Sequence, residues 1–199
     1  MNIIFKRGAT AKLPSKYGDF MTTPYIELTT GLEHLVLMKG KWSKHDSLLV
    51  RIHSSCMTGD IFGSKRCDCG EQLQKSMQMI ENEGKGIIVY LNQEGRGIGL
   101  FNKIHAYQLQ DEGLDTIQAN IALGFEADER DYTIASHILK DLGVRKIRLI
   151  TNNPDKSTAL KSSGFQIIEN IPIEMDPNQY NKFYLETKKN KMNHLLTKV

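Results

Sequence analysis

Between residues 71 and 168 the chain alternates two patterns, and this alternation restricts the fold more than any other feature. Apolar residues at helical spacing alternate with short, continuous apolar runs. The helical patterns cover residues 71–83, 100–110, 132–142 and 154–163, and the apolar runs cover 86–91, 146–150 and 165–168. A short continuous apolar run is typical of a strand covered on both faces. The alternation predicts an α/β fold, a layered α/β/α domain with a mixed, largely parallel central sheet.

The first 55 residues differ from this pattern. Residues 20–28, 33–38 and 48–53 mix β-branched, aromatic and aliphatic side chains between Gly, Lys and Ser, which predicts a β-rich N-terminal part. The last residues are charged and rich in lysine. We therefore expect a single domain over residues 1–175 and a charged tail or peripheral helix over residues 176–199.

Composition is that of an ordinary globular chain, with 40% hydrophobic and 25% charged residues. No apolar run approaches the roughly 20 residues that a membrane-spanning helix needs, and the N-terminus has no signal-peptide pattern, so we expect a cytoplasmic protein without a membrane partner. A net charge of +3 does not argue for nucleic acid. It is compatible with a small polyanionic ligand.

All three cysteines, Cys56, Cys67 and Cys69, lie within 14 residues of the 199. An odd number of cysteines in a reducing compartment argues against disulfides and favours a metal site. Zinc bound by three thiolates keeps its fourth tetrahedral position free for water or substrate. The alternative is a group of buried, reduced cysteines without a metal.

Polar clusters follow the ends of apolar runs, where ligands bind in sheets of this kind. Alternation along a strand points Arg51 and His53 to the same face, just before Cys56. Residues 92–99 form a glycine-rich loop whose backbone N–H groups can approach a phosphate, with Glu94 suited to accept hydrogen bonds from a purine. For Arg51 and His53 the alternative is a strand end with ordinary surface side chains. For residues 92–99 the alternative is a flexible connection.

Two further clusters lie near residues 128 and 151. Asp128 is a candidate proton acceptor and Arg130 a candidate phosphate partner, although an aspartate there could simply cap the next helix. Thr151 and Lys156 follow the apolar run 146–150 and suit nucleotide binding. Turn chemistry alone would also explain Asn-Asn-Pro at 152–154.

Four motifs taken together resemble GTP cyclohydrolase II. They are Arg51-Ile-His-Ser-Ser-Cys-Met-Thr-Gly-Asp, Arg66-Cys-Asp-Cys-Gly-Glu-Gln-Leu, Asn92-Gln-Glu-Gly-Arg-Gly-Ile-Gly-Leu and Thr151-Asn-Asn-Pro. The resemblance runs from about residue 49 to about residue 171. It implies a zinc- and magnesium-dependent hydrolase that opens the imidazole ring of GTP and releases formate and pyrophosphate. The product is 2,5-diamino-6-ribosylamino-4(3H)-pyrimidinone 5′-phosphate, which starts riboflavin synthesis.

The resemblance also assigns roles. Cys56, Cys67 and Cys69 resemble the zinc ligands, Asp128 the proton acceptor, and Arg130 the residue that attacks the α-phosphorus. Tyr107 matches the tyrosine associated with completing ring opening. The GTP contacts implied by the resemblance are Arg51, Ile52, His53, Ser54, Ser55, Gln72, Glu94, Gly95, Arg96, Thr116, Thr151 and Lys156.

The chemistry sets conditions on these roles. Three thiolates outweigh the two charges of zinc and make a weak Lewis acid, so cationic or hydrogen-bonding neighbours must compensate, with Lys65, Arg66, Arg51 and His53 as candidates. A guanidinium stays protonated, which makes an electrostatic clamp the simpler role for Arg130.

Departures from the family pattern and other possible functions also have to be considered. Ser55 stands where many members have a glutamate, and the chain lacks room for the upstream synthase domain of some relatives, so the resemblance implies a monofunctional form. A homodimer is expected by family analogy. The rivals are a paralogue that stops at the N-formyl intermediate and a non-catalytic, structural-zinc module that binds nucleic acid.

Overall fold

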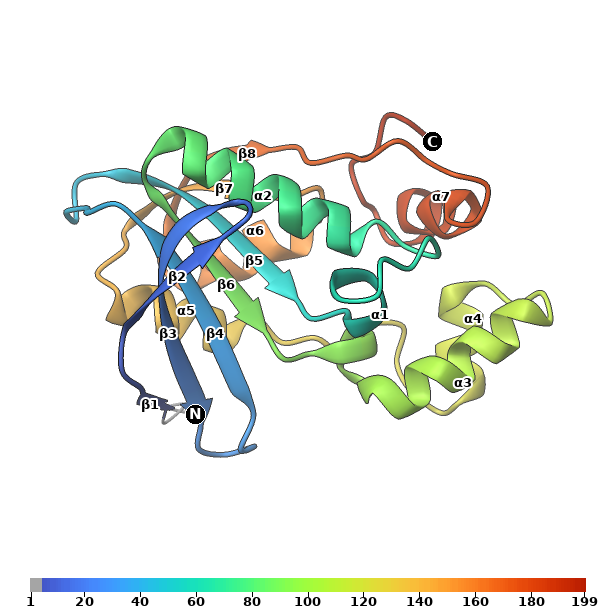
Figure 1. Ribbon diagram of the computed structural model, residues 1–199. Helices are drawn as coiled ribbons and strands as arrows, with labels where there is room; N and C mark the ends of the chain where they lie inside the picture. The colour runs from blue at the N-terminus through green and yellow to red at the C-terminus, as the bar shows by residue number, and fades with distance from the viewer. Residues whose placement is uncertain (1–4) are drawn as a thin grey trace. The chain divides into compact units, whose positions relative to one another are not determined.

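The computed structural model describes residues 5–199 and divides into two compact units (Figure 1). The sheet unit comprises residues 5–53, 73–92 and 132–173. The cysteine unit comprises residues 54–72, 93–131 and 174–199, and so includes the charged C-terminal segment. Within the described residues no helix combines the length and the apolar character that crossing a membrane requires.

An eight-stranded mixed sheet organises the described part of the sheet unit. Its order is β1-β3-β4-β6-β5-β7-β8, with β2 paired to β3 beside this path. Its strands are β1 (Phe5–Arg7), β2 (Ala11–Ser15), β3 (Gly18–Glu27), β4 (Glu33–Lys39), β5 (Ser47–Ser54), β6 (Gly86–Leu91), β7 (Lys146–Ile150) and β8 (Gln166–Ile171). The pairs from β1 to β6 by way of β3 and β4 are antiparallel, while β5, β7 and β8 are parallel neighbours. The predicted α/β class with a mixed sheet and a β-rich N-terminal part is confirmed. The sheet is not largely parallel, however, because the pairs that join β1, β2, β3, β4 and β6 are antiparallel.

Helices cover both faces of this sheet. The long helix α2 (Cys69–Glu83) lies over one face, and α5 (Thr133–Asp141) and α6 (Pro154–Ser162) lie over the other (Figure 1). The central strands β6 and β7 bury Ile87, Val89 and Leu149 completely, as continuous apolar runs between two helical layers should. Close approach of β6 to β5 requires glycine at position 86, because a Cβ there would lie 2.6 Å from the Leu49 carbonyl oxygen.

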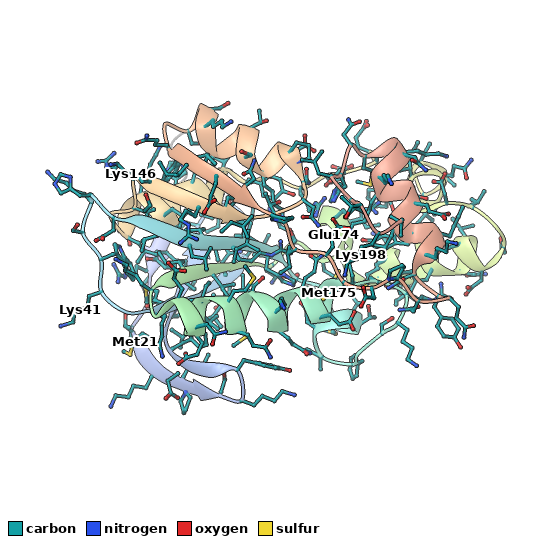
Figure 2. The ribbon with its side chains drawn as sticks, turned by 90° about the horizontal axis from the view of Figure 1, so that it is seen from above. Met21, Lys41, Lys146, Glu174, Met175 and Lys198 are labelled. Carbon is teal, nitrogen blue, oxygen red and sulfur yellow. The ribbon has the colours of Figure 1, made fainter. Side chains whose placement is uncertain are left out.

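The cysteine unit is built from short helices and loops. Its elements are α1 (Met57–Asp60), the first turn of α2, the 3₁₀ helix η1 (Glu94–Gly97), α3 (Gly99–Asp111), α4 (Thr116–Ala122) and α7 (Lys182–Lys191). The end of the chain folds back on this unit. Glu174 accepts hydrogen bonds from the backbone N–H groups of Thr197 (2.9 Å) and Lys198 (3.1 Å), and Figure 2 shows Glu174 and Lys198 side by side.

Candidate functional site

The three cysteines meet in the cysteine unit. Their Sγ atoms all lie within 4.8 Å of one another, with 3.6 Å between Cys56 and Cys67. Local structure fixes Cys56, because its N–H donates to the Asp60 carboxylate (3.0 Å) and its carbonyl accepts from the Asp60 N–H (2.7 Å). Gly59 leaves the necessary space, since a Cβ at this position would lie 3.0 to 3.1 Å from two of the sulfurs.

A zinc ion fits this donor set. Zinc–sulfur bonds of about 2.3 Å in a tetrahedron place sulfurs about 3.8 Å apart, close to the separations seen here. Within residues 5–199 the group of potential ligands comprises only the three cysteines. Three ligands leave one tetrahedral position for a non-protein ligand, which is the arrangement of a catalytic rather than a structural site.

The thiols perturb one another even without an ion. Hydrogen bonds from the Cys67 and Cys69 thiols, together with the nearby Lys103 ammonium, lower the pKa of Cys56 far below its usual range. The hydrogen bond to Cys56 raises the pKa of Cys67 to about 11. These contacts favour the thiolate form of Cys56, the form in which cysteine binds metals.

A buried lysine from α3 contacts this thiolate. The Nζ of Lys103 donates to Cys56 Sγ (3.1 Å) and to Glu94 Oε1 (2.6 Å). Burial alone would lower the pKa of Lys103, but the hydrogen bond to Glu94 and the charge of Cys56 raise it above its usual value. Sequence reasoning did not select Lys103. The available signal was its position four residues before Tyr107, which places both on the same face of a helix.

The Glu94 carboxylate, expected to contact the nucleotide, is engaged within the protein. Besides Lys103 it accepts hydrogen bonds from the backbone N–H groups of Met57 (2.6 Å) and Gly95 (3.0 Å). Glu94 thereby links the start of α1 to α3. Its observed contacts hold Lys103 against the cysteines.

Tyr107 lies on α3 close to the same group. Its hydroxyl is 3.3 Å from Thr58 Oγ1, and its ring lies under the Arg66 guanidinium (4.9 Å) and the Lys103 ammonium (5.6 Å). Burial raises the pKa of Tyr107 to about 12. The phenol is consequently neutral at physiological pH and able to donate its proton.

Asp128 and Arg130 form an ion pair in the loop that follows α4. Arg130 donates from Nε to Asp128 Oδ1 (2.8 Å) and from Nη2 to Asp128 Oδ2, and its backbone N–H also donates to Oδ1 (3.1 Å). Burial alone would raise the pKa of Asp128, but Arg130 and the charge of Arg96 hold it below the usual value. The carboxylate orients the guanidinium and is a weak base while it does so.

The loop before α3 places a second arginine near this pair. Gly95 and Arg96 both have left-handed backbone conformations, with φ of 63°. The Arg96 guanidinium lies 5.7 Å from the centre of the Tyr184 ring of α7, and the Arg96 carbonyl accepts from the Glu129 N–H (3.0 Å). Two guanidinium groups thus flank Asp128 within the cysteine unit.

The turn between Cys67 and Cys69 is tied to the C-terminal helix. Asp68 is 2% exposed, and its carboxylate accepts hydrogen bonds from Lys188 (3.1 Å) and Gln72. Lys188 also lies 4.8 Å from the centre of the Tyr184 ring. The Gln72 amide, one of the expected nucleotide contacts, is therefore engaged in holding the turn between Cys67 and Cys69.

The remaining expected contacts of the cysteine unit are spread over its loops. Ser54 directly precedes Ser55, whose hydroxyl accepts from the backbone N–H of Gln93 (3.1 Å). Thr116 is buried at the start of α4, behind the N-cap residue Asp115. The structure joins Cys56, Glu94 and Tyr107 into one continuous group but does not link Thr116 to it.

Five expected contacts lie in the sheet unit, around the carboxyl ends of its parallel strands. Lys156 donates to the Ile52 carbonyl (2.8 Å) and Arg51 to the Ile150 carbonyl (3.1 Å). The His53 ring stacks on Tyr90 of β6, with centroids 5.4 Å apart. The fifth, Thr151, exchanges hydrogen bonds with the backbone of Asn153 in the turn before α6 (3.0 and 3.2 Å).

The sequence of this chain is similar to those of known proteins. The chain is 55% identical over 193 residues to the riboflavin biosynthesis protein RibBA of Parabacteroides distasonis, 56% to that of Porphyromonas gingivalis and 50% to that of Aquifex aeolicus. These matches cover 96% to 97% of this chain and 48% of each relative, so the chain spans about half the length of the curated relatives it matches. Residues 6–172 match the family model described as GTP cyclohydrolase II. The chain therefore belongs to the GTP cyclohydrolase II family.

Proposed function

We propose that this chain catalyses the zinc-dependent hydrolysis of GTP, with release of formate and pyrophosphate, as the first step of riboflavin biosynthesis. The product is 2,5-diamino-6-ribosylamino-4(3H)-pyrimidinone 5′-phosphate. The observation that carries the proposal is the group of three cysteine sulfurs without a fourth protein ligand among residues 5–199, in a chain of this family. A closed four-ligand site would instead favour the structural-zinc module.

Cys56, Cys67 and Cys69 are the residues that would hold the ion. Bound zinc would supply a water whose pKa is lowered towards ~7, which makes it nucleophilic near neutral pH. Tyr107 is the proposed proton donor to the opening ring, and burial raises the pKa of its hydroxyl. The presence of a tyrosine at this position supports complete ring opening rather than arrest at the formylated intermediate.

Arg130 is the proposed clamp on the triphosphate, with Arg96 beside it. Its guanidinium is held in a fixed plane by Asp128, and a fixed fork of N–H donors suits phosphate oxygens. Asp128 is the proposed proton acceptor. Arg51, Ile52, His53, Thr151 and Lys156 of the sheet unit are proposed GTP contacts, as are Ser54, Ser55, Gln72, Glu94, Gly95 and Thr116. Magnesium with the nucleotide, a homodimer and a cytoplasmic location complete the proposal.

The experiment is a product analysis. Zinc-loaded protein is incubated with GTP and Mg²⁺, the nucleotide products are identified by mass spectrometry, and formate and pyrophosphate are assayed in the same tube. The deformylated diaminopyrimidine monophosphate with both small products is the expected result. A product that keeps the formyl group moves the protein to the paralogue, and unchanged GTP revives the structural-zinc module. Cys67→Ser should abolish formate release, and full release by a zinc-free Cys67→Ser variant would overturn the zinc assignment.

A further inference from the structure

A site built from three thiolates has an electrostatic problem. The thiolates bring three negative charges to an ion with two positive ones, and strong donation by sulfur weakens the Lewis acidity on which a hydrolytic zinc depends. A hydrogen bond from a cation to one of the sulfurs would relieve both effects. The cations near the cysteines in sequence do not provide it: Lys65 is exposed, and Arg66 is paired with Asp111.

The side chain of Lys103 meets the requirement. It is 7% exposed, although lysine is almost never fully buried without a partner, and its Nζ lies 3.1 Å from Cys56 Sγ. Its direction is fixed by Glu94, which accepts from Nζ at 2.6 Å while its other contacts anchor it to Met57 and Gly95. Gly95 makes this approach possible, because a Cβ there would lie 3.0 Å from the Lys103 Cβ. A buried ammonium is thus held against a proposed metal-binding sulfur by a carboxylate whose ion pair within residues 5–199 is with this lysine.

We propose that Lys103 is a positioning residue of the metal site, whose hydrogen bond to the Cys56 thiolate withdraws electron density from sulfur and so raises the Lewis acidity of the bound ion. Glu94 orients this lysine. The inference rests on the proposed function only in requiring that the three cysteines bind a metal. Partners of metal ligands typically change metal affinity or activity 10- to 100-fold when they are removed. We therefore expect Lys103→Met to lower the rate of formate release about 10- to 100-fold.

Cobalt provides a readout that does not depend on activity. Zinc is removed, Co²⁺ is added, and the thiolate-to-Co²⁺ charge-transfer band is recorded for the wild type, Lys103→Met, Lys103→Arg and Lys65→Met. A hydrogen bond stabilises the sulfur lone pair, so its loss in Lys103→Met should shift the band to longer wavelength. Lys103→Arg, which keeps a cationic donor, should restore it towards the wild-type position. Lys65→Met removes the same charge close to Cys67 without touching a sulfur and should leave the band unchanged.

The possible outcomes separate the role of Lys103 from metal binding by the cysteines. A Lys103→Met band at the wild-type position, with one Co²⁺ bound per chain, overturns the inference and leaves the proposed function intact. Failure of the wild type to bind Co²⁺ or Zn²⁺ overturns the zinc assignment itself. Lys103→Gln keeps a neutral N–H donor and is measured if Lys103→Met does not fold. Its band should lie at longer wavelength than that of the wild type, and an unshifted band contradicts the role of the charge.

Discussion

At the scale of single residues, the Asp128–Arg130 pair has the clearest consequence for the reaction. The carboxylate accepts two hydrogen bonds from the guanidinium, which fix its plane, and a third from the Arg130 backbone N–H. A guanidinium whose charge is permanent and whose plane is fixed stabilises negative charge on phosphate, but it does not act readily as a nucleophile. The geometry therefore supports a clamp.

This role predicts a selective defect in Arg130→Ala. GTP should still bind, while pyrophosphate release should fall about 100- to 1000-fold, the typical loss when a donor to developing charge is removed. Arg145→Ala is the matched control, because Arg145 is exposed in the sheet unit. Equilibrium binding of GTP and a pyrophosphate assay measure the two effects. Normal pyrophosphate formation by Arg130→Ala would refute the clamp.

The residues of the metal site were only partly predictable. The three cysteines follow from their clustering, because thiols so close in sequence have few other uses in a reducing compartment. Lys103 does not follow, because a lysine in a helix is normally read as a solvated charge, and its burial depends on the packing of α3 against α1. Gln72 and Glu94 were selected as nucleotide contacts, and the structure engages both side chains within the protein.

At the scale of elements, α4 depends on its N-cap residue, Asp115. The Asp115 carboxylate accepts from the N–H groups of Ile117 (2.8 Å) and Gln118 (2.9 Å), and the Gln118 side chain accepts from the Asp115 N–H (3.0 Å), which completes a capping box. Asp115→Ala should destabilise the protein by about 0.5–2 kcal/mol. Asp115→Asn keeps the acceptor and should lose much less. Urea unfolding of both variants measures the difference, and equal losses would contradict the cap.

The contribution of Asp115 to stability should also depend on pH. Burial alone would raise the pKa of Asp115, but the hydrogen bonds from Lys191 and the helix N–H groups hold it below the ordinary value of 3.8. A depressed carboxyl pKa contributes stability above the unfolded-state value, and this contribution is lost as the pH falls below it. The stability difference between wild type and Asp115→Asn should stay constant from pH 7 to about pH 4. It should shrink in more acidic solution, which urea unfolding at pH 7 and pH 3 would test.

A second prediction at the scale of elements concerns the ion pair between helix α7 and Asp68. Lys188 is the charged partner of buried Asp68, between two cysteines, so Lys188→Met should loosen the metal-binding turn. Breaking a buried ion pair from one side typically costs about 3–5 kcal/mol. We expect faster transfer of zinc to a chromogenic chelator. Lys182→Met on the exposed start of α7 is the control, and the double variant Asp68→Asn, Lys188→Met should recover part of the loss. Unchanged zinc transfer would contradict the role of α7.

The elements themselves show which patterns carry structural information. Strands β6 and β7 and helices α2 and α5 follow from apolar spacing, because each buries a regular face. Helix α3 was predicted from Leu100, Ile104 and Tyr107, but Leu100 and Ile104 are exposed and the helix buries Lys103 and Ala106 instead. Helix α4 was not predicted, since it is short and its signal is the capping box. The edge strands β1 and β2 were also missed, because they bury little and are held by pairing to β3. Parallel pairing is confined to one side of the sheet, which single-strand patterns do not reveal.

At the scale of the molecule, the metal should stabilise one unit selectively. The candidate ligands all belong to the cysteine unit, whereas the main hydrophobic core belongs to the sheet unit. Removing zinc with a chelator should increase hydrogen exchange in residues 56–72 and leave β6 and β7 protected. Hydrogen exchange followed by mass spectrometry measures both regions in one sample. Cys67→Ser should show the same pattern without a chelator, and a uniform increase in both units would contradict the prediction.

The left-handed conformation of Arg96 has a consequence for laboratory evolution. A side chain at this φ costs roughly 1–2 kcal/mol, whereas glycine adopts it without that penalty. A library selected for thermal tolerance alone should accordingly enrich Arg96→Gly. Selection for growth without added riboflavin should retain the arginine, because the guanidinium lies beside the Asp128–Arg130 pair. Enrichment of glycine at position 96 under the first selection and of arginine under the second would show that Arg96 lowers the stability of the loop but is needed for phosphate recognition.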